Sequence, residues 1–201
     1  MFSLQRPSPQ RIVRFLRESE QLRLTYEPVG LARTGGRGFC RDHTEVVLGR
    51  GNDVFARAWA GLEAWRQFHF PWVAITATGP PTTVGTNLAV LMRHLGFWSL
   101  NGGRIVYTLE DDARHYRRGY AYGTLTNHAE RGEEIFEVSM ARDTGEVRYA
   151  IHAVSRPRAP LAWCGYPIAR VLQHRFRRDS AAAMMKWVRQ EMAAPRNVAQ
   201  R

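Results

Sequence analysis

The chain has 201 residues, of which 44% are apolar, and this is sufficient for one domain of ordinary to large size. No stretch approaches 18 uninterrupted apolar residues, so the sequence argues against an integral membrane protein. The N-terminus also lacks the apolar region of a secretory signal. We therefore expect one cytoplasmic domain over residues 1–201, with a loose lead-in at 1–8 and a tail at 191–201.

The formal net charge of +11 raises the question of an anionic partner. Lys186 is the only lysine, and the arginines are scattered from Arg6 to Arg201, with a concentration only towards the C-terminus. Nucleic acid is therefore not a predicted partner, since few aromatic residues lie between the C-terminal arginines. Peripheral binding to an anionic membrane stays open.

The N-terminal part predicts a short helix, a glycine-rich loop and a strand. Ser8-Pro9 is typical of a helix start, and the apolar spacing predicts a helix that ends near Glu20. The run Gly35-Gly36-Arg37-Gly38 does not join a strand to a helix in a βαβ unit, so we interpret it as a loop and not as a phosphate site. Strand-forming residues then fill 39–48.

A second helix is predicted to begin at Asn52, because apolar residues recur at steps of one, three and four up to Trp65. After Pro71 the period changes from 3.6 to 2, which indicates strands. Asn101-Gly102-Gly103 is expected to be a bulge or tight turn within one of them. The predicted strands are 73–77, 84–94, 97–109, 116–125, 133–140 and 147–154.

A long helix is predicted from about residue 164 to 190, with Ile168, Val171 and Phe176 on its apolar side. Its other side carries arginines, which we expect to face solvent. Sequential hairpins followed by a long helix are typical of an α+β fold. We predict a curved seven-stranded antiparallel sheet wrapped on the C-terminal helix, with an additional N-terminal helix. The predicted basic face consists of Arg170, Arg175, Arg177, Arg178 and Arg189.

Several short motifs resemble the Domain of Unknown Function 1990 family of bacteria and plants. The likeness covers roughly residues 10–190 and departs at Thr126-Asn127 and Ala129, where the family pattern has a Pro-Gly turn and a Pro, so the shape of this loop is in doubt. The family is uncharacterised, and the resemblance implies no catalytic residue. The motifs are Tyr122-Gly123-Thr124-Leu125, His128, Arg131-Gly132-Glu133-Glu134 with Phe136, Val84-Gly85-Thr86, Arg104-Ile105-Val106, Ser155-Arg156-Pro157 and Gln173 with Phe176.

The order of strands and helices is also similar to the helix-grip superfamily of lipid-transfer START domains, pollen allergens and aromatic cyclases. This second likeness is an analogy of fold alone. It implies a space between the sheet and the C-terminal helix.

The strongest local cluster of reactive side chains is His128 with Glu133, Glu134 and the preceding Tyr122. A histidine beside a carboxylate can act as a general base. Glu133 and Glu134 are adjacent on a strand and must face opposite sides, so at most one of them joins His128. The alternative is a solvated hairpin loop. No third ligand occurs at a workable spacing, so we predict no metal and no other cofactor.

Aromatic residues on neighbouring strands are candidates for lining a cavity, and Arg156 is a candidate for clamping an anionic group. The alternatives are a core filled by the aromatic rings and an Arg156 paired with Glu137 or Glu134. Asp42, His43 and Glu45 form a second polar cluster, which either faces solvent or points inward. The candidate ligand-binding residues are Tyr107, Tyr120, Tyr122, Phe136, Tyr149 and Arg156.

Three hypotheses for function follow. The leading one is a binding module that holds a small apolar or amphipathic molecule between sheet and C-terminal helix. The second is an enzyme of cyclase or hydratase type that uses His128 with Tyr122 or a glutamate, although the balance is against an enzyme. The third is a peripheral binder that uses the arginine face. The oligomeric state is not predicted.

Overall fold

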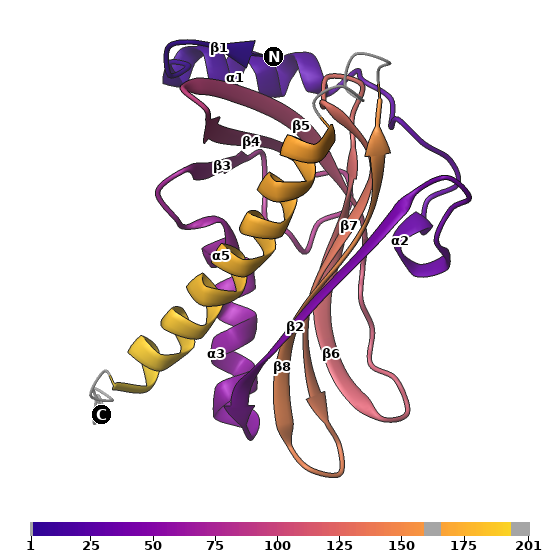
Figure 1. The fold of residues 1–201 in the computed structure, drawn as a ribbon. Coiled ribbons are helices and arrows are strands. Elements are labelled where there is room, and N and C mark those ends of the chain that lie inside the picture. The colour runs from indigo at the N-terminus through magenta and orange to yellow at the C-terminus, as the bar shows by residue number, and fades with distance from the viewer. Residues whose placement is uncertain (1, 159–165, 194–201) are drawn as a thin grey trace.

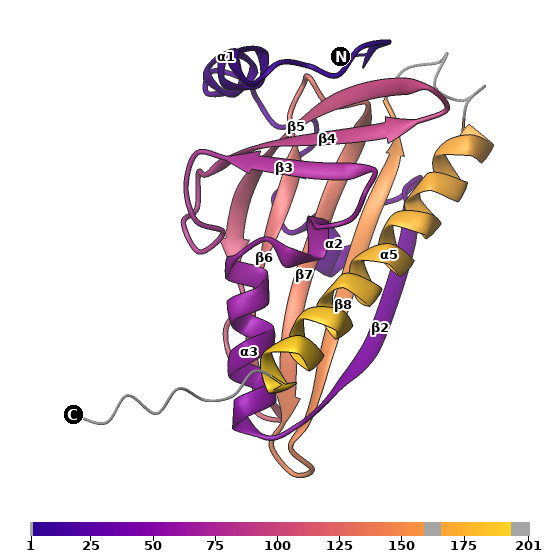
Figure 2. The ribbon, with the colours of Figure 1, turned by 90° about the vertical axis from the view of Figure 1, so that its left-hand side faces the viewer.

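The computed structural model describes residues 2–158 and 166–193. A strongly curved antiparallel sheet holds a long C-terminal helix in its concave side (Figures 1 and 2). The predicted arrangement of sheet, C-terminal helix and N-terminal helix is thus confirmed. The elements are β1 (Phe2–Ser3), α1 (Pro9–Ser19), α2 (Leu31–Thr34), β2 (Cys40–Arg50), α3 (Asn52–Glu63), the 3₁₀ helix η1 (Arg66–Phe68), β3 (Val73–Ala77), β4 (Asn87–His94), β5 (Phe97–Thr108), β6 (His115–Thr124), β7 (Glu130–Ala141), β8 (Glu146–Pro157) and α5 (Tyr166–Ala193).

The strands lie in the order β2-β8-β7-β6-β5-β4-β3, and β1 pairs with β5. All pairings are antiparallel. The short strand β1 falls within the predicted loose lead-in, where Phe2 pairs with Ser99. Strand β2, which corresponds to the predicted strand at 39–48, therefore lies at one edge of the sheet. Its partner β8 is the last strand in the sequence.

Helix α5 crosses the concave face beside α3, and apolar side chains fill the space between these helices and the lower part of the sheet (Figure 2). Phe136 of β7 and Met184 of α5 are fully buried, and the ring of Phe176 lies 5.5 Å from that of Phe68. Burial of side chains of this size contributes about 1.5–3 kcal/mol each. Because these helices bury their apolar side chains in one core, the spacing of apolar residues in α3 and in the C-terminal half of α5 predicts which side is buried.

Strand β5 runs without interruption through Gly102 and Gly103, so the predicted turn at 101–103 is wrong. The glycines are needed because side chains pack directly on the backbone there. A Cβ at Gly102 would lie 2.0 Å from Oδ1 of Asn127, and one at Gly103 would lie 2.8 Å from the ring of Tyr122. The irregularity of the strand is a shift of register between Ile105 and Tyr107.

The convex side of the sheet carries the N-terminal segments. Helix α1 packs Phe15 and Leu16 against β4 and β5, and the short helix α2 lies on β7 and β8 (Figure 1). The loop around α2 is attached by the side chain of Glu133, which is 2% exposed. This carboxylate accepts hydrogen bonds from Tyr26 and Tyr107 and from the backbone amides of Gly30 and Ala32, at distances up to 3.0 Å.

Removal of the Glu133 carboxylate should therefore destabilise the fold. Glu133→Ala leaves two hydroxyls and two amides without their acceptor, and we expect a loss of about 3 kcal/mol in the free energy of unfolding. Urea denaturation provides the measurement. Glu45→Ala, which removes an exposed carboxylate from the same face, is the control with an expected loss of about 0–1 kcal/mol. A loss below about 1 kcal/mol for Glu133→Ala would contradict this role.

Candidate functional site

A cavity of about 550 Å³ lies between the concave face of the sheet and the N-terminal half of α5. Its walls come from inward-facing residues of β4 to β8, from the β6–β7 loop and from one side of the helix. The core below it is filled by aromatic rings, so both alternatives for the interior are partly correct: the core is packed near α3 and open near the start of α5. The volume lies within the range of small-molecule sites.

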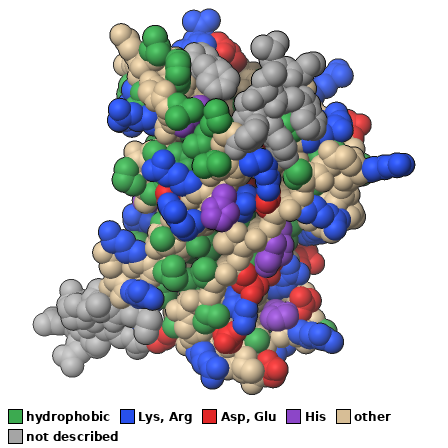
Figure 3. All heavy atoms as spheres, in the orientation of Figure 1, with side chains coloured by type: hydrophobic (Ala, Val, Ile, Leu, Met, Phe, Trp, Pro, Cys, Tyr) green, Lys and Arg blue, Asp and Glu red, His purple; other side chains and the backbone are tan. Residues whose placement is uncertain are grey.

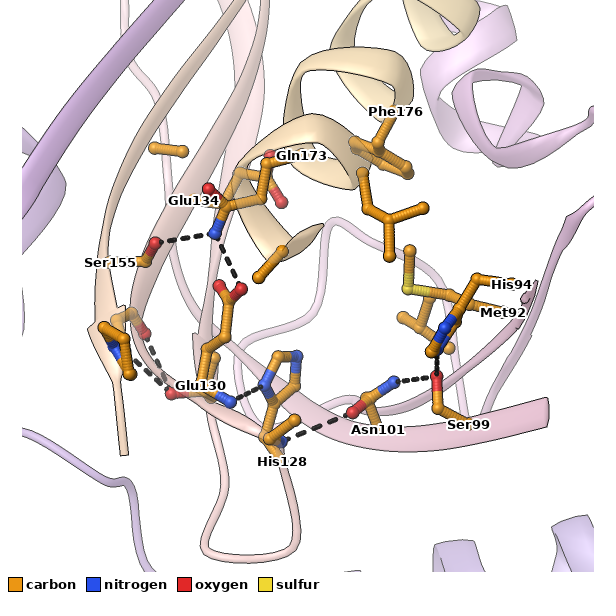
Figure 4. Close-up of a pocket in the computed structure, with 18 of the residues that line it drawn as sticks. Met92, His94, Ser99, Asn101, His128, Glu130, Glu134, Ser155, Gln173 and Phe176 are labelled. Atoms are coloured by element: carbon orange, nitrogen blue, oxygen red, sulfur yellow. Dashed lines mark hydrogen bonds between the residues drawn. The ribbon is translucent and has the colours of Figure 1, made fainter. Parts of the chain in front are cut away.

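One side of the cavity is a chain of hydrogen-bonded polar groups, which we call the polar arc (Figure 4). His94 and Asn101 both bond to Ser99 at 3.2 Å. A second group lies beyond His128 in Figure 4: Gln173 donates a hydrogen bond to Glu130 at 2.7 Å and another to Ser155 at 3.1 Å. The β6–β7 loop connects the two groups, because the amide of Ala129 donates to Asn101 at 3.3 Å and the amide of Glu130 donates to the ring of His128 at 2.9 Å. The polar arc consists of His94, Ser99, Asn101, His128, Glu130, Ser155 and Gln173.

The opposite side of the cavity is apolar. In Figure 4 Phe176 lies across the open space from His128 and Glu130, and Met92 lies beside His94. Phe68, Val90 and Leu172 complete the apolar wall. The cavity therefore has an apolar side and a hydrogen-bonding side, which is the division that an amphipathic molecule requires.

His128 is held in one orientation by the β6–β7 loop. Its backbone amide donates to Leu125 at 2.8 Å, and its ring Nδ1 accepts the backbone N–H of Glu130 at 2.9 Å. Because Nδ1 accepts, the proton of the neutral ring must lie on Nε2. Burial lowers the pKa of His128 to about 4. At neutral pH the imidazole is thus an uncharged donor, and its second nitrogen points into the cavity (Figure 4).

Glu134 also faces the cavity, and Tyr122 donates to its carboxyl group at 2.8 Å. Burial raises the pKa of Glu134 to about 7, against the opposing effects of the Tyr122 hydrogen bond and the Arg177 charge. Burial likewise raises the pKa of Glu130. The alternation of β7 thus separates two adjacent glutamates: Glu134 joins the cavity with His128, and Glu133 binds the α2 loop on the convex side.

Two of the arginines that were expected to face solvent turn inward. Arg170 bonds both carboxylate oxygens of Asp42, and Arg177, with a side chain that is 8% exposed, contacts the same carboxylate at 3.1 Å. Burial raises the pKa of Asp42, but the hydrogen bond from Arg170 and the charge of Arg177 outweigh it and hold the pKa below its ordinary value. The predicted basic outer face of the helix is therefore wrong for Arg170 and Arg177.

The remaining basic side chains do not form one patch on the face that Figure 3 displays, where they alternate with apolar and acidic groups. Arg175 and Arg178 both pair with Asp179, at 3.5 and 3.0 Å. Val171, expected on the apolar side of the helix, is 68% exposed. Ile168, expected on the same side, is 49% exposed but does line the cavity. The inward side of the first turns of α5 carries polar residues, so the spacing of apolar residues did not predict which side of these turns faces the sheet.

The candidate ligand-binding residues divide into three groups. Tyr122 lines the cavity. Tyr120, Phe136 and Tyr149 face the same side but are fully buried in the filled core, where the hydroxyl of Tyr149 bonds to Ser180 at 2.8 Å. They support the cavity from below and do not reach its space.

Tyr107 and Arg156 lie on the convex side, contrary to expectation. The register shift at Val106 pairs Ile105 with Tyr122 but Tyr107 with Ala121, which turns the tyrosine outward. Arg156 contacts neither Glu137 nor Glu134; its guanidinium lies 4.6 Å from the ring centre of Phe39. The register shift hid the position of Tyr107 from a strict two-residue period. The same period, applied along the regular strand β8, does put Arg156 on the face opposite Tyr149 and Ile151.

The second polar cluster is split in the same way. Asp42 points inward to α5, whereas His43 and Glu45 face outward, with His43 Nδ1 3.1 Å from Nδ1 of His152.

Within residues 2–158 and 166–193, no group of three or more His, Cys, Asp or Glu side chains could hold a metal ion. Over the same residues, no helix has both the length and the hydropathy needed to span a bilayer.

Sequence reasoning missed several residues of the polar arc. Glu130 lies four residues before Glu134 on the same strand face, so extension of the alternation would have found it. Gln173 was noted as part of a motif without a role. His94, Ser99 and Asn101 carry no pattern that separates them from ordinary strand residues, because only the curvature of the sheet brings β4 and β5 opposite α5.

A curved antiparallel sheet that closes on a long C-terminal helix, with a cavity between them, defines a helix-grip protein. The chain belongs to the family described as "Domain of unknown function (DUF1990)", whose sequence model matches residues 25–183. It is 36% identical over 155 residues to a UPF0548 protein of Dictyostelium discoideum, an alignment that covers 73% of this chain and 72% of the relative. It is 30% identical over 156 residues to the UPF0548 protein At2g17695 of Arabidopsis thaliana, covering 75% and 74%. The expected family is therefore confirmed, and its members are not restricted to bacteria.

Solved structures share the fold at low sequence identity. The protein NE0264 of Nitrosomonas europaea matches with a TM-score of 0.50 and 13% identity, over 77% of this chain and 97% of that one. Human STARD10 matches with a TM-score of 0.48 and 11% identity, over 94% and 84%. At these identities the comparison concerns the fold alone.

The raised pKa of Glu134 has a consequence for stability. The folded state binds this proton more tightly than the unfolded chain, so the contribution of Glu134 is greatest below pH 4.5 and falls as the pH rises from 4.5 to about 7. Glu134→Gln should therefore raise stability relative to the parent more at pH 8 than at pH 5. Urea denaturation at the two pH values measures this, and Glu45→Gln on the convex face is the control. An equal effect of Glu134→Gln at both values would contradict the prediction.

The state of His128 can be observed directly. We expect the ¹⁵N chemical shifts of its ring to show the neutral Nε2–H form, without titration between pH 5 and 8, because its pKa is about 4. His128→Gln assigns the signal. A charged ring or the Nδ1–H form at pH 7 would show that the hydrogen bond from Glu130 does not hold the imidazole.

Proposed function

We propose that the protein is a binding module whose cavity holds a small apolar or amphipathic molecule between the sheet and α5. The observation that carries the proposal is the division of the cavity into an apolar wall and a continuous polar arc. An apolar wall supplies affinity through burial, and a few fixed polar groups orient the ligand. The polar arc is already hydrogen-bonded within itself, so little ordering of side chains is required when a ligand enters.

A second candidate function is catalysis in the same cavity. It is favoured by the meeting of His128, Tyr122 and Glu134 on one wall and by the pKa of Glu134 near 7, which suits proton transfer at neutral pH. Glu133 is not part of this candidate, because its carboxylate is bound on the convex side. The binding function is preferred because it requires only the cavity, whereas a reaction also requires a substrate positioned against these groups.

The binding proposal is tested by filling the cavity. Leu172→Trp adds bulk on the cavity wall, and Val171→Trp adds the same bulk at the neighbouring position, which is 68% exposed. Native mass spectrometry of freshly purified protein should show a co-purified small molecule on the parent and on Val171→Trp. We expect Leu172→Trp to bind it about tenfold more weakly, equivalent to about 1.4 kcal/mol, and so to retain it at lower occupancy.

Thermal unfolding of both variants shows whether they are folded. If folded Leu172→Trp keeps the same occupancy as Val171→Trp, the bound molecule lies elsewhere and the proposal is wrong. Denaturing mass spectrometry and extraction of the parent then identify the chemical class of the molecule.

A further inference from the structure

The polar end of the cavity contains both acidic and basic groups. The carboxyl groups of Glu130 and Glu134 and the guanidinium group of Arg177 line this end, and Arg170 and Arg177 both pair with Asp42, which does not line it. The charge of Arg158 acts on His128 at the same end. Burial lowers the pKa of His128 to about 4, and it also lowers the pKa of His94, so neither adds a positive charge at neutral pH. An anionic head group would meet these carboxyl groups. Arg170 and the Nη2 group of Arg177 already bind Asp42, and Nε of Arg177 is a guanidinium nitrogen that is buried without a hydrogen-bond partner.

The same end presents one donor beside acceptors. Nε2–H of His128 points into the cavity, and the Glu130 carboxyl rises from the strand next to it (Figure 4). One oxygen of Glu130 accepts Gln173, and one oxygen of Glu134 accepts Tyr122, which leaves acceptor capacity on both carboxyl groups. These free positions can complement a group that both accepts and donates.

The common head groups differ in how well they meet this arrangement. An ammonium group has only donors and would leave Nε2–H of His128 unpaired in a buried site. A ketone has only an acceptor and would leave the remaining acceptor positions of Glu130 unused. A hydroxyl group accepts from His128 and donates to a carboxylate, and it remains uncharged in the apolar surroundings.

We propose that the cavity recognises an uncharged molecule with a hydroxyl group, an alcohol or a phenol, whose oxygen accepts from Nε2–H of His128 and whose proton is donated to the carboxylate of Glu130. The apolar body of the molecule lies against Met92, Leu172 and Phe176. This inference rests on the proposed binding function and specifies the chemical class of the ligand.

A series of naphthalene probes that differ only in the head group tests the inference. The series is 2-naphthalenemethanol, 2-methylnaphthalene, 2-acetonaphthone, 2-naphthylmethylammonium and 2-naphthoate, each titrated at pH 7 with detection by fluorescence and calorimetry. Two hydrogen bonds in a buried site should make the alcohol bind about tenfold more tightly than the methyl compound. The ketone, ammonium and carboxylate should all bind more weakly than the alcohol.

Variants then assign the preference to the named groups. His128→Phe removes the donor, and we expect the alcohol to bind within about twofold of the methyl compound in this variant. Glu45→Gln, on the convex face, should keep the full preference. If His128→Phe does not fold, the order of affinity of the five probes for the parent protein still tests whether the cavity prefers a hydroxyl group.

The outcomes separate this inference from the proposed function. Binding of the methyl, ketone, ammonium or carboxylate probe as tightly as the alcohol overturns the hydroxyl assignment and leaves a ligand-binding cavity. An unchanged preference in folded His128→Phe overturns the role of His128. Failure of all five probes, together with the absence of a co-purified molecule, overturns the proposed function itself.

Discussion

The packing of α5 across the concave face of the sheet is the contact on which the rest of the structure depends. Near its C-terminal half, Met184 and Val188 close on α3 and the lower strands and complete the buried core. In its N-terminal half, the helix presents Gln173, Arg170 and Arg177 as well as apolar groups, and these polar side chains bind the sheet by hydrogen bonds and ion pairs. The cavity lies at this end because polar contacts hold the helix there without filling the space beneath it.

Adjacent residues of β7 show how one strand serves both stability and the site. The side chains of Glu133 and Glu134 project to opposite faces, and their surroundings give the two carboxyl groups opposite roles. The first accepts four hydrogen bonds and fastens the N-terminal loop. The second receives one hydrogen bond from Tyr122 and has a pKa near 7. An acid with unused acceptor capacity in a cavity is available to a ligand, whereas a fully bonded acid is part of the framework.

The helix and strand periods predicted most of the fold, since α3, α5 and the sequential hairpins are regular and amphipathic. The site was predicted less completely. Tyr122, His128 and Glu134, which are near in sequence, line the same cavity, and strand alternation puts Tyr122 and Glu134 in contact. Tyr107 was misplaced by an irregular register, and Arg170 and Arg177 by the assumption that arginines on a helix face water. A buried ion pair such as Arg177 with Asp42 joins residues far apart in the chain and leaves no local pattern.

The sequence by itself determined the order of the elements, the family, and the separation of Glu133 from Glu134, because each of these depends on local spacing or on short motifs. Only the tertiary structure decided whether the interior is filled or open. That outcome depends on how far α5 stands from the sheet, and this distance is set by contacts between β2, β7, β8 and α5 that no local period encodes. The polar arc has the same origin: its members come from six segments and become neighbours only when the curved sheet closes on the helix.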